Sequence, residues 1–281
     1  MKKVLVTGAN GQLGRCIRDA AKKYSTLEFI FASRSLLNVD EEASVEKFFE
    51  ENQFDYCINT AAYTNVEKAE RDTVKAFHTN AEAARIIAEQ CERKGIVLLH
   101  ISTDYVFDGE KGEPYVEEDE TNPINVYGSS KLKGEEYIEK SCKKYFIFRT
   151  SWLYSQYGHN FLNTILKYAS EGKDLTITTE QVGVPTNAND LAKVLIEVIA
   201  EGSEEYGLYH ACNLGQATWY DFAKEILTIT KQIKNINLAK TEHYSTFAAR
   251  PKYSVLSIKK VEIIFKSNMV RWQDSLYELL N

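Results

Sequence analysis

The sequence lacks the patterns that identify several large classes of protein. Its five cysteines lie far apart and form no Cys-x-x-Cys pair. This pattern predicts free thiols in a reducing compartment and no zinc site. No apolar run reaches the roughly 18 residues that a membrane-spanning helix needs. The first residues form an apolar run of strand length and not an export signal, so we expect a cytoplasmic protein.

Clusters of one charge are also missing. The 34 basic and 40 acidic side chains give a net charge of −6, and no block of like charges stands out. An acidic chain without a basic stripe argues against general binding of nucleic acid or of a membrane surface. Any anionic ligand must therefore be held by a few local groups.

No internal repeat or low-complexity linker interrupts the chain, and 44% of its residues are hydrophobic, enough for a substantial core. Apolar runs alternate with helical patterns over the first 150 residues, which predicts an α/β fold with a doubly wound parallel sheet. Beyond residue 151 this rhythm breaks. We therefore expect a dinucleotide-binding domain at 1–150 and a smaller C-terminal substrate domain at 151–281, with some later segments returning to the sheet. The expected strands are 4–7, 27–32, 56–60, 97–102 and 145–149, and the main expected helices are 13–24, 41–52 behind an Asp40 cap, 80–94 before Gly95, 161–172, 189–201 and 219–231.

A glycine-rich turn follows the first expected strand and opens the first expected helix. Gly8, Gly11 and Gly14 occupy the spacing G-x-x-G-x-x-G, with Gln12 and Leu13 between the last two. Glycines let the backbone approach a pyrophosphate, and the helix N-terminus offers free N–H groups to it. The pattern predicts dinucleotide binding, although a packing turn of another α/β protein would look similar.

The end of the second expected strand indicates which dinucleotide is bound. NAD-preferring folds usually carry an acidic residue there, whereas this chain has Ser33 and Arg34. A guanidinium pairs well with phosphate oxygens, so we predict NADPH as the preferred cofactor, with NADH possible. The alternative is that Arg34 is an ordinary solvated surface charge.

Tyr127 and Lys131 are four residues apart, one turn apart on the same helical face. A nearby ammonium stabilises a phenolate, so this pair suits proton transfer to a ketone. Thr103, at the end of the fourth expected strand, can supply the hydroxyl that holds the ketone oxygen, and parallel sheets bind ligands at this edge. A second Tyr-x-x-x-Lys, Tyr220 and Lys224, has no such hydroxyl and is interpreted as a helix face that packs on the core.

These features resemble an extended short-chain dehydrogenase, and specifically the dTDP-4-dehydrorhamnose reductase family. The similarity runs nearly end to end. The segments that carry it are 11–14, 59–64, 102–109, 126–132, 149–152, 160–161, 181–186 and 250–251, of which Ser-Thr-Asp-Tyr-Val-Phe and Arg-Thr-Ser-Trp are the most specific.

The resemblance implies reduction of the C4 ketone of dTDP-4-dehydro-β-L-rhamnose to dTDP-β-L-rhamnose. It implies that Thr103, Tyr127 and Lys131 are the catalytic hydroxyl, tyrosine and lysine. Further cofactor contacts are expected from Asn38, Val39, Ala62, Tyr63 and Thr64, and substrate contacts from Thr103, Asp104, Tyr105, Trp152 and Arg250.

Trp152 offers an apolar face and an N–H donor to a deoxysugar, and Arg250 suits a diphosphate. Their ordinary alternatives are a partly buried tryptophan and a surface ion pair, and Asp104 would otherwise cap backbone groups. Some family members bind magnesium at a dimer interface through an acid on the first helix. This chain has Arg15 there, so we predict no metal site, and a monomer or a homodimer.

Two other functions stay open at this point. One is a different sugar-nucleotide enzyme on the same scaffold, an epimerase or a dehydratase. The other is a non-catalytic protein that resembles the regulatory β subunit of methionine adenosyltransferase. The complete set of Thr103, Tyr127 and Lys131 favours the reductase.

Overall fold

A six-stranded parallel sheet forms the centre of the computed structural model, which describes residues 1–242, 244–267 and 269–281. The strand order is β2-β1-β3-β4-β5-β10, and every neighbouring pair is parallel. The strands are β1 (Lys2–Thr7), β2 (Leu27–Phe31), β3 (Tyr56–Asn59), β4 (Val97–Thr103), β5 (Tyr145–Thr150) and β10 (Gly207–His210). From β1 the chain adds β2 on one side and then β3, β4 and β5 on the other, so the strand order reverses between β1 and β3. A ligand crevice is expected at this point, outside the carboxyl ends of the strands.

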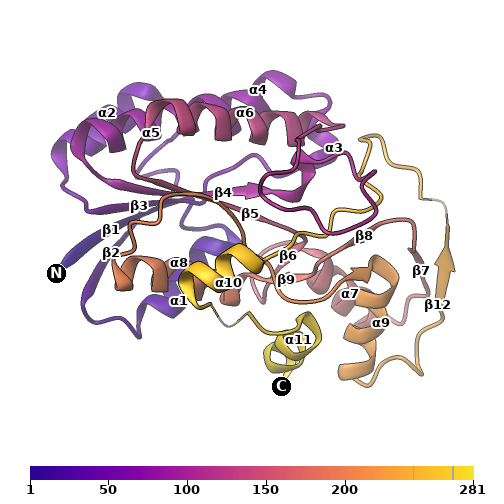
Figure 1. The fold of residues 1–281 in the computed structure, drawn as a ribbon. Helices are drawn as coiled ribbons and strands as arrows, with labels where there is room; N and C mark the ends of the chain where they lie inside the picture. The colour runs from indigo at the N-terminus through magenta and orange to yellow at the C-terminus, as the bar shows by residue number, and fades with distance from the viewer. Residues whose placement is uncertain (243, 268) are drawn as a thin grey trace.

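Helices cover both faces of this sheet, as Figure 1 shows. One face carries α1 (Gln12–Ala21), α8 (Ala188–Glu201) and α10 (Lys259–Phe265); the other carries α2 (Glu42–Glu51), α3 (Val66–Ala69), α4 (Thr73–Phe77), α5 (Ala83–Lys94) and α6 (Val126–Ser141). In β1, Val4 and Val6 belong to the core beside α1 and α8, while Leu5 belongs to the core beside α2 and α5. Burial on both faces explains why the strands are nearly continuous apolar runs. The predicted doubly wound α/β fold is confirmed.

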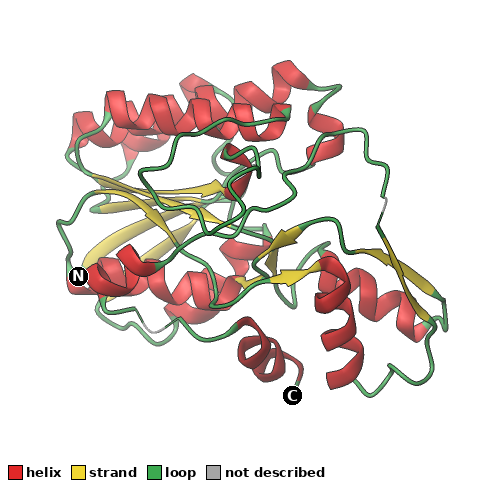
Figure 2. Ribbon diagram, turned by 45° about the vertical axis from the view of Figure 1, so that its right-hand side comes forward, coloured by secondary structure: helices red, strands yellow, loops and turns green. Residues whose placement is uncertain are grey.

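A smaller unit lies beside the sheet in Figure 2 and has its own apolar core. Its elements are α7 (Phe161–Ser170), α9 (Trp219–Ile229), α11 (Trp272–Leu280) and the pair β7 (Leu175–Thr178) with β12 (Leu238–Thr241). Two short pairs connect the units, β6 (Leu153–Tyr154) with β9 (Thr186–Asn187) and β8 (Val182–Gly183) with β11 (Ala217–Thr218). Between β9 and β11 the chain returns to the large unit, to which it contributes α8 and β10. The division into domains at residue 151 stays a prediction.

Two local expectations need correction. The helix predicted to start at 80 starts earlier, because α4 continues through the π-helical turn His78–Glu82 into α5, which ends at Gly95 with φ 70° as predicted. Asp40 does not cap α2. The N-cap residue is Glu41, which makes no side-chain cap, and the Asp40 carboxylate instead accepts a hydrogen bond from Arg34. An ion pair with a guanidinium competes with capping for the same oxygens.

Candidate active site

A cavity of about 770 Å³ opens at the carboxyl ends of the strands and extends into the smaller unit. Its wall combines the glycine turn, the ends of β3, β4 and β5, the start of α6, and residues of α7 and α9. Most residues predicted for the site line it: Gly8, Gly11, Gln12, Leu13, Arg34, Asn38, Val39, Ala62, Thr64, Thr103, Asp104, Tyr105, Tyr127, Lys131, Trp152 and Arg250.

Three residues of the predicted cofactor site lie outside this wall. Gly14 packs against the turn that follows β1, and a Cβ there would lie 2.7 Å from the Ala9 Cα. The Ser33 hydroxyl lies 2.9 Å from that of Ser35. The Tyr63 hydroxyl donates to Asp72 at 2.8 Å, while its neighbours Ala62 and Thr64 line the cavity. Gly14 thus lets α1 pack closely on the end of the strand–turn segment, in keeping with the packing role of the last glycine in such a turn.

The glycine turn has the form that a pyrophosphate requires. Gly8 adopts φ 61°, and a Cβ at this position would lie 2.7 Å from the Ala61 backbone nitrogen. No side chain caps the N-terminus of α1, whose N-cap residue is Gly11. The first N–H groups of α1 are therefore available to an anion, at the positive end of the helix dipole. These residues fit the dinucleotide that the sequence predicts.

Gln12 connects this turn to the chain that follows β5. Its Nε2 donates to the Leu153 carbonyl at 3.0 Å, and its Oε1 accepts from Ser155 at 3.3 Å and from Asn160 at 3.2 Å. Both ends of the amide are thus used within the protein. The cofactor turn and the segment that carries Trp152 are held as one structure.

The start of α6 places Tyr127, the predicted catalytic tyrosine. The Asn125 side chain caps the helix by accepting from the Gly128 N–H at 2.7 Å, and Tyr127 stands in the first turn. A Cβ on Gly128 would lie only 2.1 Å from the Tyr105 carbonyl oxygen. Only glycine lets α6 approach the chain after β4 so closely, and this contact brings Tyr127 beside Thr103.

Tyr127 and Thr103 both line the cavity, and Thr103 lies close enough to affect the pKa of the Tyr127 phenol. Burial raises the pKa of Tyr127 above its usual value, and the bond to Thr103 lowers it by a smaller amount. Tyr127 is therefore protonated at neutral pH and can act as the proton donor.

Lys131 lies one turn further along α6 and is 2% exposed. Its Nζ donates to the Ile101 carbonyl at 2.6 Å and lies 3.1 Å from Nε2 of His100. Burial lowers the pKa of Lys131 to about 8, and the negative charge of Glu135 opposes that shift. Glu135 itself forms a buried ion pair with Arg149, with N···O at 2.6 Å.

Asp104 is buried among three hydroxyl groups that donate to it, from Ser254 at 2.6 Å, Ser151 at 3.0 Å and Thr103 at 3.1 Å. Burial raises its pKa to about 6, and these three bonds lower it by less. Ser254 belongs to the C-terminal segment that also carries Arg250. Asp104 thus joins the end of β4, the end of β5 and this segment at the cavity wall.

Two tryptophans form an aromatic wall at the end of the cavity nearer the smaller unit. The rings of Trp152 and Trp219 stack with centroids 3.6 Å apart and planes at 5°. Trp152 adopts the left-handed φ of 41°, and a Cβ at Gly183 would lie 2.5 Å from its ring. Trp219 is held in turn by a hydrogen bond from Nε1 to Gln181 at 3.0 Å. One face of Trp152 is therefore covered by Trp219.

Arg250 and Arg34, the two guanidinium groups of the cavity wall, are each paired with a carboxylate. Arg250 donates to Glu67 at 2.8 Å, and its side chain is 23% exposed. Arg34 donates to Asp40 at 2.8 Å, and its side chain is 71% exposed. Both arginines remain predicted contacts of an anionic ligand. To bind it, each guanidinium would leave its carboxylate partner or contact the carboxylate and the ligand together.

Arg15 stacks on an aromatic ring in this structure. Its guanidinium lies 3.8 Å above the ring of Tyr157, which donates to Asp19 at 2.5 Å. Among residues 1–242, 244–267 and 269–281, no three or more histidine, cysteine or acidic side chains gather as metal ligands.

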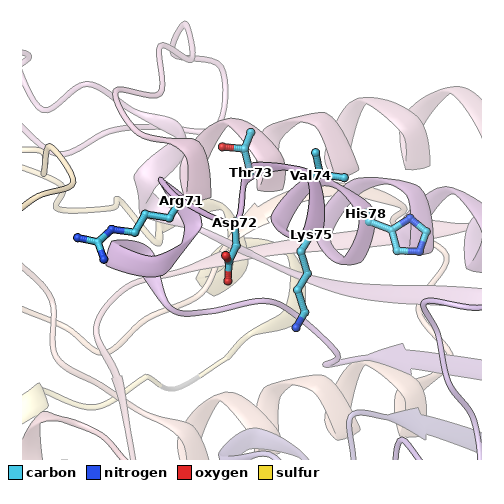
Figure 3. Close-up of a pocket in the computed structure, with 6 residues that line it drawn as sticks. All are labelled: Arg71, Asp72, Thr73, Val74, Lys75 and His78. Carbon is cyan, nitrogen blue, oxygen red and sulfur yellow. The ribbon is translucent and has the colours of Figure 1, made fainter.

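A second hollow, of about 560 Å³, lies along α4 and is shown in Figure 3. Asp72 and Lys75 project to the same side of the helix there. All the lining residues are exposed and come from one short stretch of chain: Arg71, Asp72, Thr73, Val74, Lys75 and His78. The cavity at the sheet edge gathers buried polar groups from many elements, which identifies it as the site.

Sequence reasoning missed several residues of the cavity wall. The sequence indicates Trp219 only as the start of a helix, because nothing in it shows that this residue meets Trp152. Ser151 lies within the Arg-Thr-Ser-Trp segment and could have been found there. Others that were not predicted are Asn10, Leu37, Thr60, Ala61, Thr79, Ile101, His159 and Phe161.

Fold and site together define an NAD(P)H-dependent oxidoreductase of the short-chain dehydrogenase class. A family model described as RmlD substrate binding domain matches residues 1–281. The chain is 39% identical to the spore coat polysaccharide biosynthesis protein SpsK of Bacillus subtilis over 93% of this chain and 91% of that protein. It is 35% identical to the dTDP-4-dehydrorhamnose reductase of Aggregatibacter actinomycetemcomitans, over 98% and 97%. The chain therefore belongs to the dTDP-4-dehydrorhamnose reductase family.

Solved structures agree with this assignment. A dTDP-4-dehydrorhamnose reductase from Clostridium acetobutylicum has a TM-score of 0.93 and 39% identity, covering 99% of this chain and 98% of that one. The reductase of Bacillus anthracis, solved in complex with NADP, has a TM-score of 0.92 and 35% identity, covering 99% of each chain. A UDP-glucose 4-epimerase from Thermus thermophilus, 19% identical, shares the fold alone. The family predicted from the sequence is confirmed.

None of the helices described here combines the length and apolar character that crossing a bilayer requires.

Proposed function

We propose that this protein uses NADPH to reduce the C4 ketone of dTDP-4-dehydro-β-L-rhamnose to dTDP-β-L-rhamnose. The observation that carries the proposal is that Thr103, Tyr127 and Lys131 line the same cavity as the glycine turn. A proton donor and a dinucleotide turn in one cavity are what ketone reduction requires. Family membership supplies the substrate class.

The chain's own groups act on the ketone oxygen. Bound NADPH would supply the hydride that forms the new C–H bond at C4 of the sugar. Tyr127 gives its hydroxyl proton to the oxygen as the C=O double bond becomes a single bond, which leaves a neutral alcohol and a phenolate. With substrate bound, the Thr103 hydroxyl would turn from Asp104 to donate a hydrogen bond to the same oxygen, which keeps that oxygen within reach of Tyr127.

Lys131 has two tasks in this scheme. As an ammonium it stabilises the phenolate that remains on Tyr127 after the transfer. Its position at the cavity wall also lets it hold the ribose next to the nicotinamide. Its Nζ already donates to the Ile101 carbonyl and lies next to His100, which leaves at least one further N–H for a ligand.

The remaining predicted contacts select the sugar nucleotide. Trp152 and its partner Trp219 provide an apolar wall for the 6-deoxy sugar, and Asp104 with Tyr105 borders the position of the ketone. Arg250 is the cation suited to the diphosphate. A cytoplasmic location and a monomeric or homodimeric state stay predictions.

The test is turnover with a defined substrate. Purified protein, NADPH and dTDP-4-dehydro-L-rhamnose are mixed, and the nicotinamide absorbance is followed while the product is identified by mass and NMR. We expect loss of absorbance with formation of dTDP-rhamnose. Epimerisation or dehydration without net consumption of NADPH would indicate another enzyme of this scaffold. NADPH binding without any conversion would favour a regulatory protein.

A further inference from the structure

His100 is a fully buried histidine on β4 to which the proposed reaction assigns no task. Its Nε2 lies 3.1 Å from Nζ of Lys131, and its Nδ1 lies 3.1 Å from Nδ2 of Asn59 on β3. The Asn59 amide oxygen accepts in turn from the Thr7 hydroxyl at 2.6 Å. A buried line of hydrogen bonds therefore runs from β1 through β3 and β4 to the catalytic lysine.

The direction of this line follows from one backbone group. The Ala61 N–H points to the Asn59 amide oxygen at 3.3 Å, and a backbone N–H can only donate. The oxygen of the amide is thus fixed toward Ala61 and Thr7, and the amide N–H₂ faces His100. Nδ1 of His100 must then accept, which leaves the single proton of a neutral imidazole on Nε2, pointing at Lys131.

An N–H on Nε2 can donate a hydrogen bond to an uncharged amine at Lys131, because the amine nitrogen has a lone pair. The same N–H is repelled by an ammonium, which has no lone pair to accept with. Burial keeps the pKa of His100 well below its usual value, so the ring stays neutral. Burial also lowers the pKa of Lys131 to about 8, so the amine is within reach near neutral pH.

We propose that Asn59 and His100 are positioning residues for Lys131, which hold its Nζ from β4 and favour the uncharged amine in the empty site. The lysine then becomes an ammonium when the cofactor ribose and the phenolate of Tyr127 offer it better acceptors. The inference rests on the proposed function, because it assigns Lys131 its role in that reaction.

Other charged groups face Lys131 from the neighbouring elements. Glu135 on α6 carries the opposite charge and is paired with Arg149 of β5. Tyr127 precedes Lys131 by one turn on the same face of α6; burial raises the pKa of Tyr127, and Asp104 adds to that rise. Among these groups, Lys131 is the one expected to lose its proton in mildly alkaline solution.

The decisive variant is His100→Asn. The amide of this asparagine reaches the position of the histidine Nδ1, so Asn59 keeps a hydrogen-bond partner. The variant lacks the Nε2–H group that donates to Lys131. NADPH affinity is measured by nicotinamide fluorescence from neutral to alkaline pH, together with kcat over the same range. We expect the alkaline limb of both profiles to move up by about one pH unit, the equivalent of one hydrogen bond or tenfold in the ionisation constant.

His210→Asn is the matched control. His210 on β10 is also fully buried and neutral, with a pKa lowered to about 3 chiefly by burial, but its Nδ1 faces the Tyr115 carbonyl. This control is expected to lose stability and to leave the alkaline limb in place. If His100→Asn does not fold, Asn59→Asp replaces it. The new carboxylate presents only acceptor oxygens to Nδ1 of His100, so the ring proton moves from Nε2 to Nδ1. The alkaline limb should then also move to higher pH.

An unmoved limb in the His100 or Asn59 variant overturns the inference. A limb that moves down in His100→Asn also overturns it, because His100 would then be accepting from an ammonium. NADPH binding needs no sugar. A protein that binds NADPH and reduces no dTDP-sugar would refute the proposed function, while the binding profile would still decide the role of His100.

Discussion

Trp152 and Trp219 stack face to face, with planes 5° apart, although one follows β5 and the other begins α9. The contact joins the large unit to the smaller one at the cavity wall. It also supports a backbone conformation that a non-glycine residue seldom adopts, since φ of Trp152 is 41°. Trp219 therefore shapes the proposed sugar site through Trp152.

Replacing Trp219 by leucine should weaken sugar-nucleotide binding. An aromatic stack contributes roughly 0.5–1.5 kcal/mol beyond area burial, so we expect KM for the dTDP-sugar to rise about three- to tenfold with a smaller change in kcat. Steady-state kinetics at saturating NADPH measure this. Trp272→Phe is the control, because Trp272 lies in the core of the smaller unit and donates to Gln216. It should lower stability and leave KM unchanged; an equal rise in both variants would contradict the assignment.

Tyr127→Phe should nearly abolish reduction. The change removes the proton donor and keeps the ring that packs edge-to-face on Tyr105. Loss of a general acid typically lowers kcat by about 10²–10⁴-fold. The sequence supplies its own control in the second Tyr-x-x-x-Lys: Tyr220→Phe should retain the wild-type rate. Similar kcat values for the two variants would remove Tyr127 from the mechanism, and NADPH binding by both would show that the site has folded.

Arg34→Gln should reduce the preference for NADPH over NADH. If Arg34 leaves Asp40 to bind the 2′-phosphate, its loss removes one charge-assisted pair, and KM for NADPH should rise about tenfold while KM for NADH changes little. Both constants are measured at saturating sugar nucleotide. Arg85→Gln, which removes a surface arginine paired with Glu82 and Glu89, is the control and should change neither. Equal KM values for the two cofactors in the wild type would already refute the preference.

Asp104 should make the protein more stable at mildly acidic pH than at neutral pH. Burial raises its pKa from 3.8 to about 6 in the folded state. The folded protein then binds more protons than the unfolded chain between these values. The stabilisation is complete below about pH 4 and is lost as the pH rises through about 6, with a total of about 3 kcal/mol.

Denaturant unfolding of the wild type and Asp104→Asn over this pH range tests that expectation. The amide does not ionise, so the variant should lack this contribution, and its stability relative to the wild type should increase from pH 4 to pH 7. A difference between the two proteins that is constant with pH would show that the carboxyl group is not destabilised by burial.

Much of the molecule is determined by local sequence. Apolar runs of strand length between helical patterns specify a sheet covered on both faces, and the glycine turn specifies where a dinucleotide can approach. Tyr127 and Lys131 share a helical face because their spacing matches one turn. Short-range features of this kind depend on backbone geometry and on the periodicity of burial, so they can be predicted from the sequence alone.

Long-range partners were decided only by the tertiary structure. The pairing of Trp152 with Trp219, the connection of Asp104 to Ser254 and the line from Thr7 to Lys131 join residues that no sequence spacing relates. Arg34 shows the same limit, since its residue type suits phosphate and yet its partner in the fold is Asp40. Such contacts arise because packing the two units brings distant strand ends and loops to one edge of the sheet, where buried polar groups must find partners.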